Sequence, residues 1–298
     1  MASLQAKIVK AILRVKPYSW AKGSVEDQRA RQEALIRRMQ VNQDIQFQPV
    51  HLNGFMAEWA LTPDPKPLAV LYLHGGAYAL GSLNVHRGFL ARFAAATGAQ
   101  VLAINYRLAP EHPFPAALED ALSAYQWLLI QGFDPARVVI AGDSAGGGLT
   151  LATIAALRDA AEPLPACAVC ISPWVDLTFS SRSIHTKASA DPLLHADVLA
   201  PYVQYYAGGC EKSHPLISPL FADFEGFPPL LIHVGTEEIL LDEVRQLVHN
   251  AQAAGVDVSL KLWQGLFHVF QMVPFLPESK QSLTQISAFI NHHVHPID

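Results

Sequence analysis

A G-x-S-x-G pentapeptide that joins a strand-like run to a helix-like run constrains this chain more than any other feature. It spans residues 142–146 and has Ser144 at its centre. Residues 138–141 before it are apolar and mostly β-branched, and residues 149–158 after it have a helical composition. A strand, a sharp turn and a helix in this order form a nucleophile elbow, which lifts the serine hydroxyl off the sheet. An ordinary glycine-rich turn is the alternative, but the flanking elements favour Ser144 as a nucleophile.

Composition and charge limit the class of protein. The chain has 298 residues, which suits one large α/β domain with insertions or two small domains, and its 51% hydrophobic and 16% charged residues allow a sizeable core. Its formal net charge of −5 argues against nucleic acid or an acidic membrane surface as a partner. Residues 1–16 lack the continuous apolar stretch of a signal peptide, and no later run is long enough for stable membrane insertion. We therefore expect a cytoplasmic protein.

The three cysteines give no sign of redox or metal chemistry. Cys167 and Cys170 form a C-x-x-C pattern, but they lie in an apolar run that predicts a strand. Residues three apart in a strand point to opposite faces, so we expect two separate buried thiols. Cys210 stands alone, and this usage fits a reducing compartment. The histidines form no H-E-x-x-H pattern, so no metal is expected.

Strand-like and helix-like segments alternate through most of the chain. The segments that predict strands are 45–52, 57–61, 68–73, 101–106, 138–141, 167–172, 230–234 and 258–263. The segments that predict helices between and after them are 91–97, 116–131, 149–158 and 278–293. This alternation predicts an α/β fold with a mostly parallel, doubly wound sheet.

Two regions do not follow the alternation. Residues 1–45 are helical in pattern and amphipathic, especially 25–39, and carry no strand signal. Residues 178–219 contain a helix-like piece at 192–206 but no clear strand. We expect both regions to form a helical cap over the carboxyl edge of the sheet, with 46–298 as the catalytic domain. The alternative for the second region is a long surface excursion.

A serine nucleophile needs a base, and His268 is the best candidate. It stands just beyond the last expected strand, 258–263, where a base on a loop tip is needed. His233 lies inside a buried strand and fits a core histidine better. The other histidines that we considered lie in the 178–219 region or near the end of the chain: His185, His195, His214, His292, His293 and His295.

An acid should follow the strand 230–234 and orient the base. The segment after this strand offers Glu237, Glu238 and Asp242. Asp242 is placed to open the next helix, where a negative charge suits the helix dipole. The two glutamates point in different directions from one turn, so only one of them should reach His268. Spacing alone leaves the choice open, with a slight preference for Glu238.

The oxyanion formed in the reaction needs backbone N–H donors. One donor is the amide of Ala145, directly after the nucleophile. Others should come from the loop after strand 68–73, which reads His-Gly-Gly-Ala at 74–77. Consecutive glycines let their amides approach a substrate without steric hindrance, which points to Gly75 and Gly76.

Together these segments resemble the bacterial hormone-sensitive lipase family of α/β-hydrolase carboxylesterases. The resemblance covers most of the chain from about residue 65 onward. It rests on the following motifs: His74-Gly75-Gly76-Ala77, Tyr106 to Glu111, Phe114-Pro115-Ala116, Gly142 to Gly147, Ser172 to Leu177, and the segment around His268. The resemblance implies an α/β-hydrolase fold with a helical cap, a Ser-acid-His esterase, and no cofactor.

The resemblance also implies roles for single residues. It places Glu238 at the catalytic acid position, where the family commonly has Asp. Ala77 departs from a usual third glycine, so we rank Gly75, Gly76 and Ala145 above it as oxyanion donors. Structural duties are implied for the remaining polar residues of the motifs: His74, Arg107, Glu111 and Asp176. Asp143 is expected to order its loop, with substrate contact as the alternative.

We therefore expect a serine carboxylesterase that hydrolyses short-chain acyl esters through an acyl-enzyme, with a small-molecule ester as its partner. A catalytically silent binding protein of the same fold, or an amide hydrolase with the same triad, are the alternatives. Strand 258–263 should lie at a sheet edge, where a homodimer could form.

Overall fold

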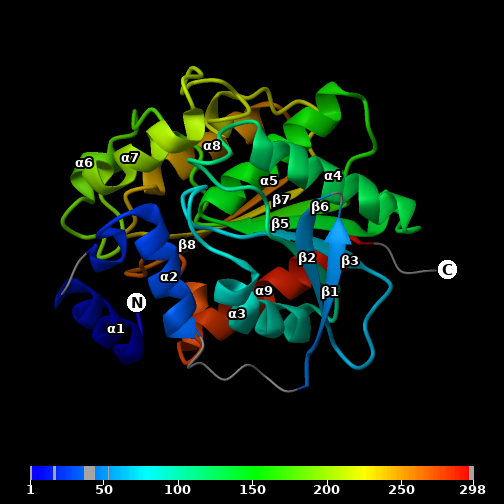
Figure 1. Ribbon diagram of the computed structural model, residues 1–298, viewed down its shortest axis with the longest axis horizontal. Coiled ribbons are helices and arrows are strands. Elements are labelled where there is room, and N and C mark those ends of the chain that lie inside the picture. Colours follow the sequence, from blue (N-terminus) through cyan, green and yellow to red (C-terminus); the bar gives the residue numbers. More distant parts are fainter. Residues whose placement is uncertain (1, 16–17, 37–43, 53, 295–298) are drawn as a thin grey trace.

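The computed structural model describes residues 2–15, 18–36, 44–52 and 54–294, and an eight-stranded sheet forms its centre (Figure 1). The strand order is β1-β2-β4-β3-β5-β6-β7-β8. Their bounds are Gln46–Leu52, Phe55–Leu61, Ala69–Leu73, Gln100–Ile104, Val138–Asp143, Cys167–Ile171, Leu230–Gly235 and Val258–Trp263, for β1 to β8 in turn. β2 is antiparallel to its two neighbours, and the other pairs are parallel. This arrangement confirms the α/β-hydrolase type of mostly parallel sheet.

Helices cover both faces of the sheet (Figure 1). The bounds of α1 to α9 in turn are Leu4–Val15, Val25–Ile36, Leu83–Thr97, Ala116–Ile130, Ala145–Asp159, Ser183–Thr186, Ala196–Ala207, Leu241–Ala253 and Pro277–His293. Short 3₁₀ turns lie at Ser19–Ala21, Pro135–Arg137, Pro219–Phe221 and Phe270–Met272. No helix among the described residues is long and apolar enough to cross a bilayer.

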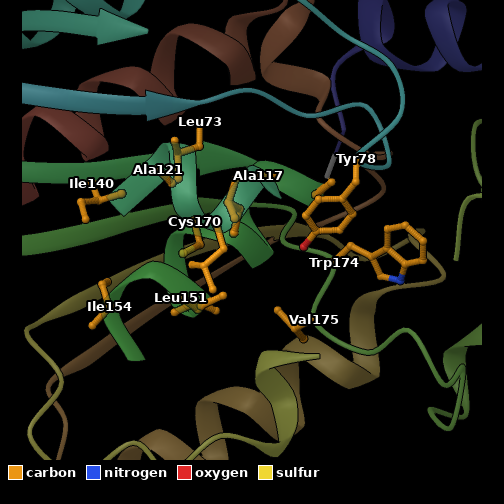
Figure 2. Close-up of a cluster of buried hydrophobic side chains, with 14 of the residues drawn as sticks. Leu73, Tyr78, Ala117, Ala121, Ile140, Leu151, Ile154, Cys170, Trp174 and Val175 are labelled. Carbon is orange, nitrogen blue, oxygen red and sulfur yellow. The ribbon is translucent and has the colours of Figure 1, made fainter. Parts of the chain in front are cut away.

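Alternate strand residues supply two separate apolar layers. Cys170 belongs to the layer under α4, α5 and α8, in the same cluster of buried side chains as Leu151 and Ala121 (Figure 2). Cys167 belongs to the opposite layer, under α3 and α9. Both thiols are buried and free, as the opposite-face argument predicts, and burial raises the pKa of each to about 12. They are therefore packing residues of two different faces.

Three helices begin elsewhere than expected. α3 starts at Leu83 rather than at 91, because the Ser82 hydroxyl accepts a bond from Val85 N and so caps the first turn. α5 starts at Ala145, immediately after Ser144, rather than at 149. Its first turns are rich in glycine, a poor helix former, which concealed them in the sequence pattern. α7 starts at Ala196, since His195 accepts a bond from Asp197 N.

The N-terminal helices and the 178–219 region lie together on one side of the molecule (Figure 1, left). Trp20 Nε1 donates to Leu193 O at 3.0 Å, and Tyr202 donates to the Gln28 amide oxygen. Arg14 also donates to Ala190 O. The expected 178–219 region contains no strand and is hydrogen-bonded to the N-terminal segment.

The amphipathic pattern expected for residues 25–39 does not describe how α2 is held. Only Val25 and Gln28 are buried, and Leu35 is 68% exposed. Polar side chains fasten the helix instead: Arg29 donates to Ala79 O at 2.8 Å, and Gln32 accepts from Gly81 N. Residues 37–39 of the expected helix, like His295, lie outside the described residues.

Candidate active site

Three segments far apart in the sequence meet at Ser144. His268 Nε2 lies 2.9 Å from Ser144 Oγ, and His268 Nδ1 lies 2.8 Å from Glu238 Oε2. Each residue follows a different parallel strand, β5, β7 or β8, at its carboxyl end. The structure thus brings together the nucleophile, base and acid that the sequence suggests, in hydrogen-bonded order.

A strained backbone presents the serine. Ser144 has φ 53° and ψ −121°, which a residue with a side chain rarely adopts. Its N–H donates to Ile171 O at 2.9 Å, and its carbonyl accepts from Trp174 N at 3.0 Å. These bonds to β6 and to the loop after it hold the turn in place.

Glycines let the elbow close. A Cβ at Gly146 would collide with the backbone carbonyl of Leu73, and a Cβ at Gly142 would collide with that of Gly146. A Cβ at Gly147 would come within 2.8 Å of the Pro173 side chain. The spacing of G-x-S-x-G therefore reflects the close approach of α5 to β3 and β5.

His268 lies in the loop between β8 and the 3₁₀ turn at Phe270–Met272, and only 7% of it is exposed. Burial alone would lower the pKa of His268, but the hydrogen bond and charge of Glu238, helped by Asp191 and Asp143, raise it above its usual value. The imidazole is therefore well placed to accept a proton from Ser144.

Glu238 is fully buried, and both of its carboxylate oxygens are occupied. Oε1 accepts from Gly235 N and, at 2.7 Å, from the hydroxyl of Ser172, while Oε2 faces His268. The Ser172 hydroxyl lies 3.3 Å from Val269 N, which donates to it, so one serine joins the loops that carry the acid and the base. In the sequence, Ser172 stands out only as the first residue of the 172–177 motif. Its place at the end of β6, between β5 and β7, is the signal that could have identified it.

The other acidic candidates do not reach His268. Glu237 is paired with Lys10 at 2.7 Å, and Arg14 approaches its other oxygen at 3.8 Å. Asp242 lies in the first turn of α8 and is paired with Arg245 at 3.1 Å. Of the three candidates, only Glu238 lies within hydrogen-bond distance of His268.

The backbone amides of the Gly-rich loop, 74–77, differ in whether they already have an acceptor. Gly75 N donates to Asp143 Oδ1 at 3.0 Å, so this amide is already engaged. Within the described ranges, the N–H groups of Gly76, Ala77 and Ala145 have no protein acceptor. Ala77 has a positive φ of 52° and lines the same cavity as Ser144. Gly75 therefore supports the loop, and Ala77, which we ranked last, has a free amide.

Asp143 orders this loop, as expected from its position beside Ser144. It is 4% exposed, and its Oδ1 accepts from the hydroxyl of Tyr72 at 2.8 Å as well as from Gly75. Burial works to raise the pKa of Asp143, but the nearby His86 and the bond from Tyr72 hold it below its usual range. Asp143 is therefore a charged anchor, and it also forms part of the cavity wall.

His74 is a neutral brace. Its ring stacks on Tyr106 with centroids 4.3 Å apart, and its Nδ1 lies 2.8 Å from Gly75 O. Burial, with the nearby His86, lowers the pKa of His74 to about 3. The ring therefore stays uncharged and fixes the start of the loop.

The remaining motif residues hold other loops through charge and hydrogen bonds. Arg107 is paired with Asp120 at 2.8 Å, and Glu111 with Arg29 at 2.7 Å. Asp176 accepts from the backbone amides of Thr178 and Ser180. The structural duties implied for these residues agree with their contacts.

A cavity of about 200 Å³ lies in front of Ser144 and His268. Its apolar wall toward the 178–219 region consists of Leu193, Leu194, Leu199 and the N-terminal Trp20. Gln32 and His86 supply polar groups to the wall. Among the described residues, no group of three or more His, Cys, Asp or Glu side chains could hold a metal ion.

Comparison with known proteins gives consistent matches. A family model described as alpha/beta hydrolase fold matches residues 70–272. An acetyl-hydrolase of Streptomyces hygroscopicus is 42% identical over 97% of either chain, and an esterase of Acinetobacter venetianus is 37% identical over 86% of either chain. A crystal structure of an esterase from the bacterial hormone-sensitive lipase family superposes with a TM-score of 0.93 at 42% identity, covering 99% of this chain and 100% of that one.

The close approach at the elbow predicts a position-specific cost for a methyl group. Gly146→Ala should destabilise the fold by about 2 kcal/mol or more, because the new Cβ would collide with the backbone carbonyl of Leu73, which β3 holds in place. Gly88→Ala in α3 is the matched control, since a Cβ there meets nothing within 4 Å. It should stabilise by about 0.5–1 kcal/mol. Urea unfolding of both variants measures the difference, and equal stabilities would contradict the packing argument.

Proposed function

This chain belongs to the alpha/beta hydrolase family, among the bacterial hormone-sensitive lipase family esterases, and is a carboxylic ester hydrolase; from that premise we propose that it works through a serine nucleophile. Ser144 is the nucleophile, His268 the base and Glu238 the acid. The observation that carries the proposal is the placement of His268, with 2.9 Å to Ser144 Oγ on one side and 2.8 Å to Glu238 on the other. This is the geometry that activated serine nucleophiles require.

The first half of the reaction forms an acyl-enzyme. Ser144 Oγ attacks the ester carbonyl carbon while His268 Nε2 takes the hydroxyl proton. Glu238 holds the imidazole ring in orientation and stabilises its positive charge. The tetrahedral intermediate collapses when the carbon–oxygen bond to the leaving alkoxide breaks, and His268 returns its proton to that oxygen. The alcohol leaves, and the acyl group remains on Ser144.

Water completes the cycle. His268 takes a proton from a water molecule, whose oxygen attacks the acyl carbon. The second tetrahedral intermediate breaks its bond to Ser144 Oγ, which regains a proton from His268. A carboxylic acid is released, and the enzyme returns to its starting state without a cofactor.

The oxyanion of both intermediates is stabilised by the amides of Gly76, Ala77 and Ala145. This assignment is supported by the hydrogen bonds: among the described residues these three amides have no protein acceptor, whereas Gly75 N donates to Asp143. Ala145 also begins α5, whose N-terminal dipole favours negative charge. One such donor is typically worth about 10²–10³ in rate.

The cap assignment is part of the same proposal. The described residues among 1–45 and the 178–219 region of the 46–298 catalytic domain form one cap. Support comes from Trp20 and Leu193, which are hydrogen-bonded to each other and share the cavity wall in front of Ser144. The cap then shapes the space for the substrate, a small-molecule ester.

Two other functions use the same fold. A silent binding protein is disfavoured, because the relatives carry the names of active hydrolases and all three triad positions are filled. An amide hydrolase would use the same residues as an esterase. Rates on matched ester and amide substrates separate these two activities.

Replacement of the nucleophile tests the mechanism. Ser144→Ala should lower kcat/KM for a short p-nitrophenyl ester by about 10⁴-fold or more, because neither the base nor the oxyanion donors can replace the missing oxygen. Ser259→Ala, on the exposed side of β8, should leave the rate unchanged. Activity of Ser144→Ala near that of the wild type would defeat the assignment.

The cavity predicts a preference for short acyl chains. In a series of p-nitrophenyl esters from acetate to dodecanoate, kcat/KM should be highest for the short members. A cavity of about 200 Å³ whose wall is formed in part by leucine side chains has little room for a long acyl chain. Leu194→Ala should move the optimum to longer chains, and Leu35→Ala on the exposed face of α2 should not. Highest rates on long-chain emulsions would contradict this preference.

The position of β8 supports a homodimer. β8 lies at the edge of the sheet, as predicted from the sequence, so its outer backbone is open to pairing with a second copy. Light scattering should therefore give twice the 32.5 kDa mass of one chain. A mass of 32.5 kDa at all concentrations would reject the dimer.

A further inference from the structure

One buried carboxylate outside the proposed triad joins the cap to the loop that carries the acid. Asp191, between α6 and α7, is 2% exposed. Its Oδ1 accepts from the backbone amides of Leu193 and Leu194 at 2.9 and 3.0 Å. Its Oδ2 accepts from Ile239 N at 3.0 Å. The carboxylate thus joins two segments that are 45 or more residues apart in sequence.

The two segments have different duties. Leu193 and Leu194 line the cavity in front of Ser144. Ile239 directly follows Glu238 in the acid loop, which we define as residues 235–240. The cap also holds the carbonyl of Ile239, because the hydroxyl of Ser183 in α6 donates to it. Both polar groups of this residue's backbone are therefore held by the cap.

A carboxylate suits this position better than an amide side chain. Three N–H groups converge on it, and only a carboxylate can accept with both oxygens. An asparagine would place its NH₂ group against one of the N–H donors and lose a bond. Within the described ranges, no lysine or arginine forms an ion pair with Asp191.

Burying this charge is costly. Burial raises the pKa of Asp191 to about 6, against the opposing effects of His268 and of the amide donors Leu193 and Ile239. A buried carboxylate without a Lys or Arg partner lowers the stability of the fold. Its position between the cavity wall and the acid loop points to a role in catalysis instead.

We propose that Asp191 is a positioning residue that couples the cap wall of the substrate cavity to Glu238, so that the cap holds the catalytic acid in line with His268. The proposal rests on the triad proposed above. When a bound acyl group orders Leu193 and Leu194, the Asp191 carboxylate passes this ordering to Ile239, the residue after Glu238. The cap thereby contributes to the chemical step as well as to substrate binding.

Asp191 also acts on the base through its charge. The carboxylates that raise the pKa of His268 are Glu238 from the acid loop, Asp191 from the cap and Asp143 from the elbow. Asp191 in turn faces His268, Glu238 and the phenol of Tyr18. Neutralising Asp191 removes one of three negative charges near the imidazolium, so the pKa of His268 should fall. Because hydrolysis needs the neutral imidazole, the acid limb of the activity profile should then move to lower pH.

The first test is Asp191→Asn, which keeps the shape and removes the charge and one acceptor. We expect kcat to fall about 10-fold or more for both acetate and hexanoate esters, since small misplacements of catalytic groups cost up to about 10² in rate. The acid limb of kcat/KM should move to lower pH. Asp197→Asn is the matched control, because this cap carboxylate is 93% exposed and lies beside His195. It should leave kcat and the pH profile unchanged.

A double-mutant cycle tests whether the effect passes through the acid. Glu238→Gln alone should reduce kcat, and adding Asp191→Asn should then cost much less than it does in the wild type. Additive losses would show that Asp191 acts independently of Glu238 and would overturn the coupling. An increase in KM for the longer ester with unchanged kcat and pH profile would reduce Asp191 to a wall residue and overturn it as well.

Failure of the coupling can be told from failure of the proposed triad. If Ser144→Ala is inactive but Asp191→Asn matches the wild type, the triad stands and the coupling is wrong. If Ser144→Ala stays active, the triad itself is wrong. Should Asp191→Asn not fold, hydrogen exchange on the wild-type protein gives a second test. The amides of Leu193, Leu194 and Ile239 should share similar protection, and fast exchange at Ile239 alone would overturn the proposal.

Discussion

The close approach of α5 to β3 and β5 at the elbow is the constraint on which the rest of the site depends. Gly142 and Gly146 leave no room for a side chain between these backbones, and Ser144 is held at a positive φ between them. This backbone conformation directs Ser144 Oγ toward the carboxyl edge of the sheet, where the loops after β7 and β8 begin. Without it, His268 and Glu238 would have no hydroxyl within reach.

Hydrogen-bonded networks, rather than additional apolar packing, fix the loops around the elbow. Asp143 orders the Gly-rich loop 74–77, Ser172 joins the loops that carry Glu238 and His268, and Asp191 joins Ile239 to Leu193 and Leu194. All three side chains are buried, so each hydrogen bond replaces water that the site excludes. Such networks have one satisfied arrangement, which suits a site in which distances of about 3 Å decide the chemistry.

Much of the fold could be predicted from local pattern, and the misses have physical causes. The continuous apolar runs of β3, β5 and β7 identified a sheet covered on both faces. The start of α5 was missed because its glycines, poor helix formers in isolation, are required there by tertiary contact. The helix at α2 was predicted, but its amphipathic character was wrong, because Arg29 and Gln32 hold the helix through polar contacts rather than an apolar face.

The sequence by itself determined the class of fold and pointed to Ser144 and His268, since the elbow motif and the position of a residue after the last strand depend on local spacing. The tertiary structure decided which of several equivalent groups are available. Glu237 and Glu238 are neighbours, yet Lys10 engages one and His268 the other. Gly75 and Gly76 are chemically identical, yet only the first amide is taken by Asp143. The reason is physical: whether a donor or acceptor is free depends on partners that folding brings from distant parts of the chain.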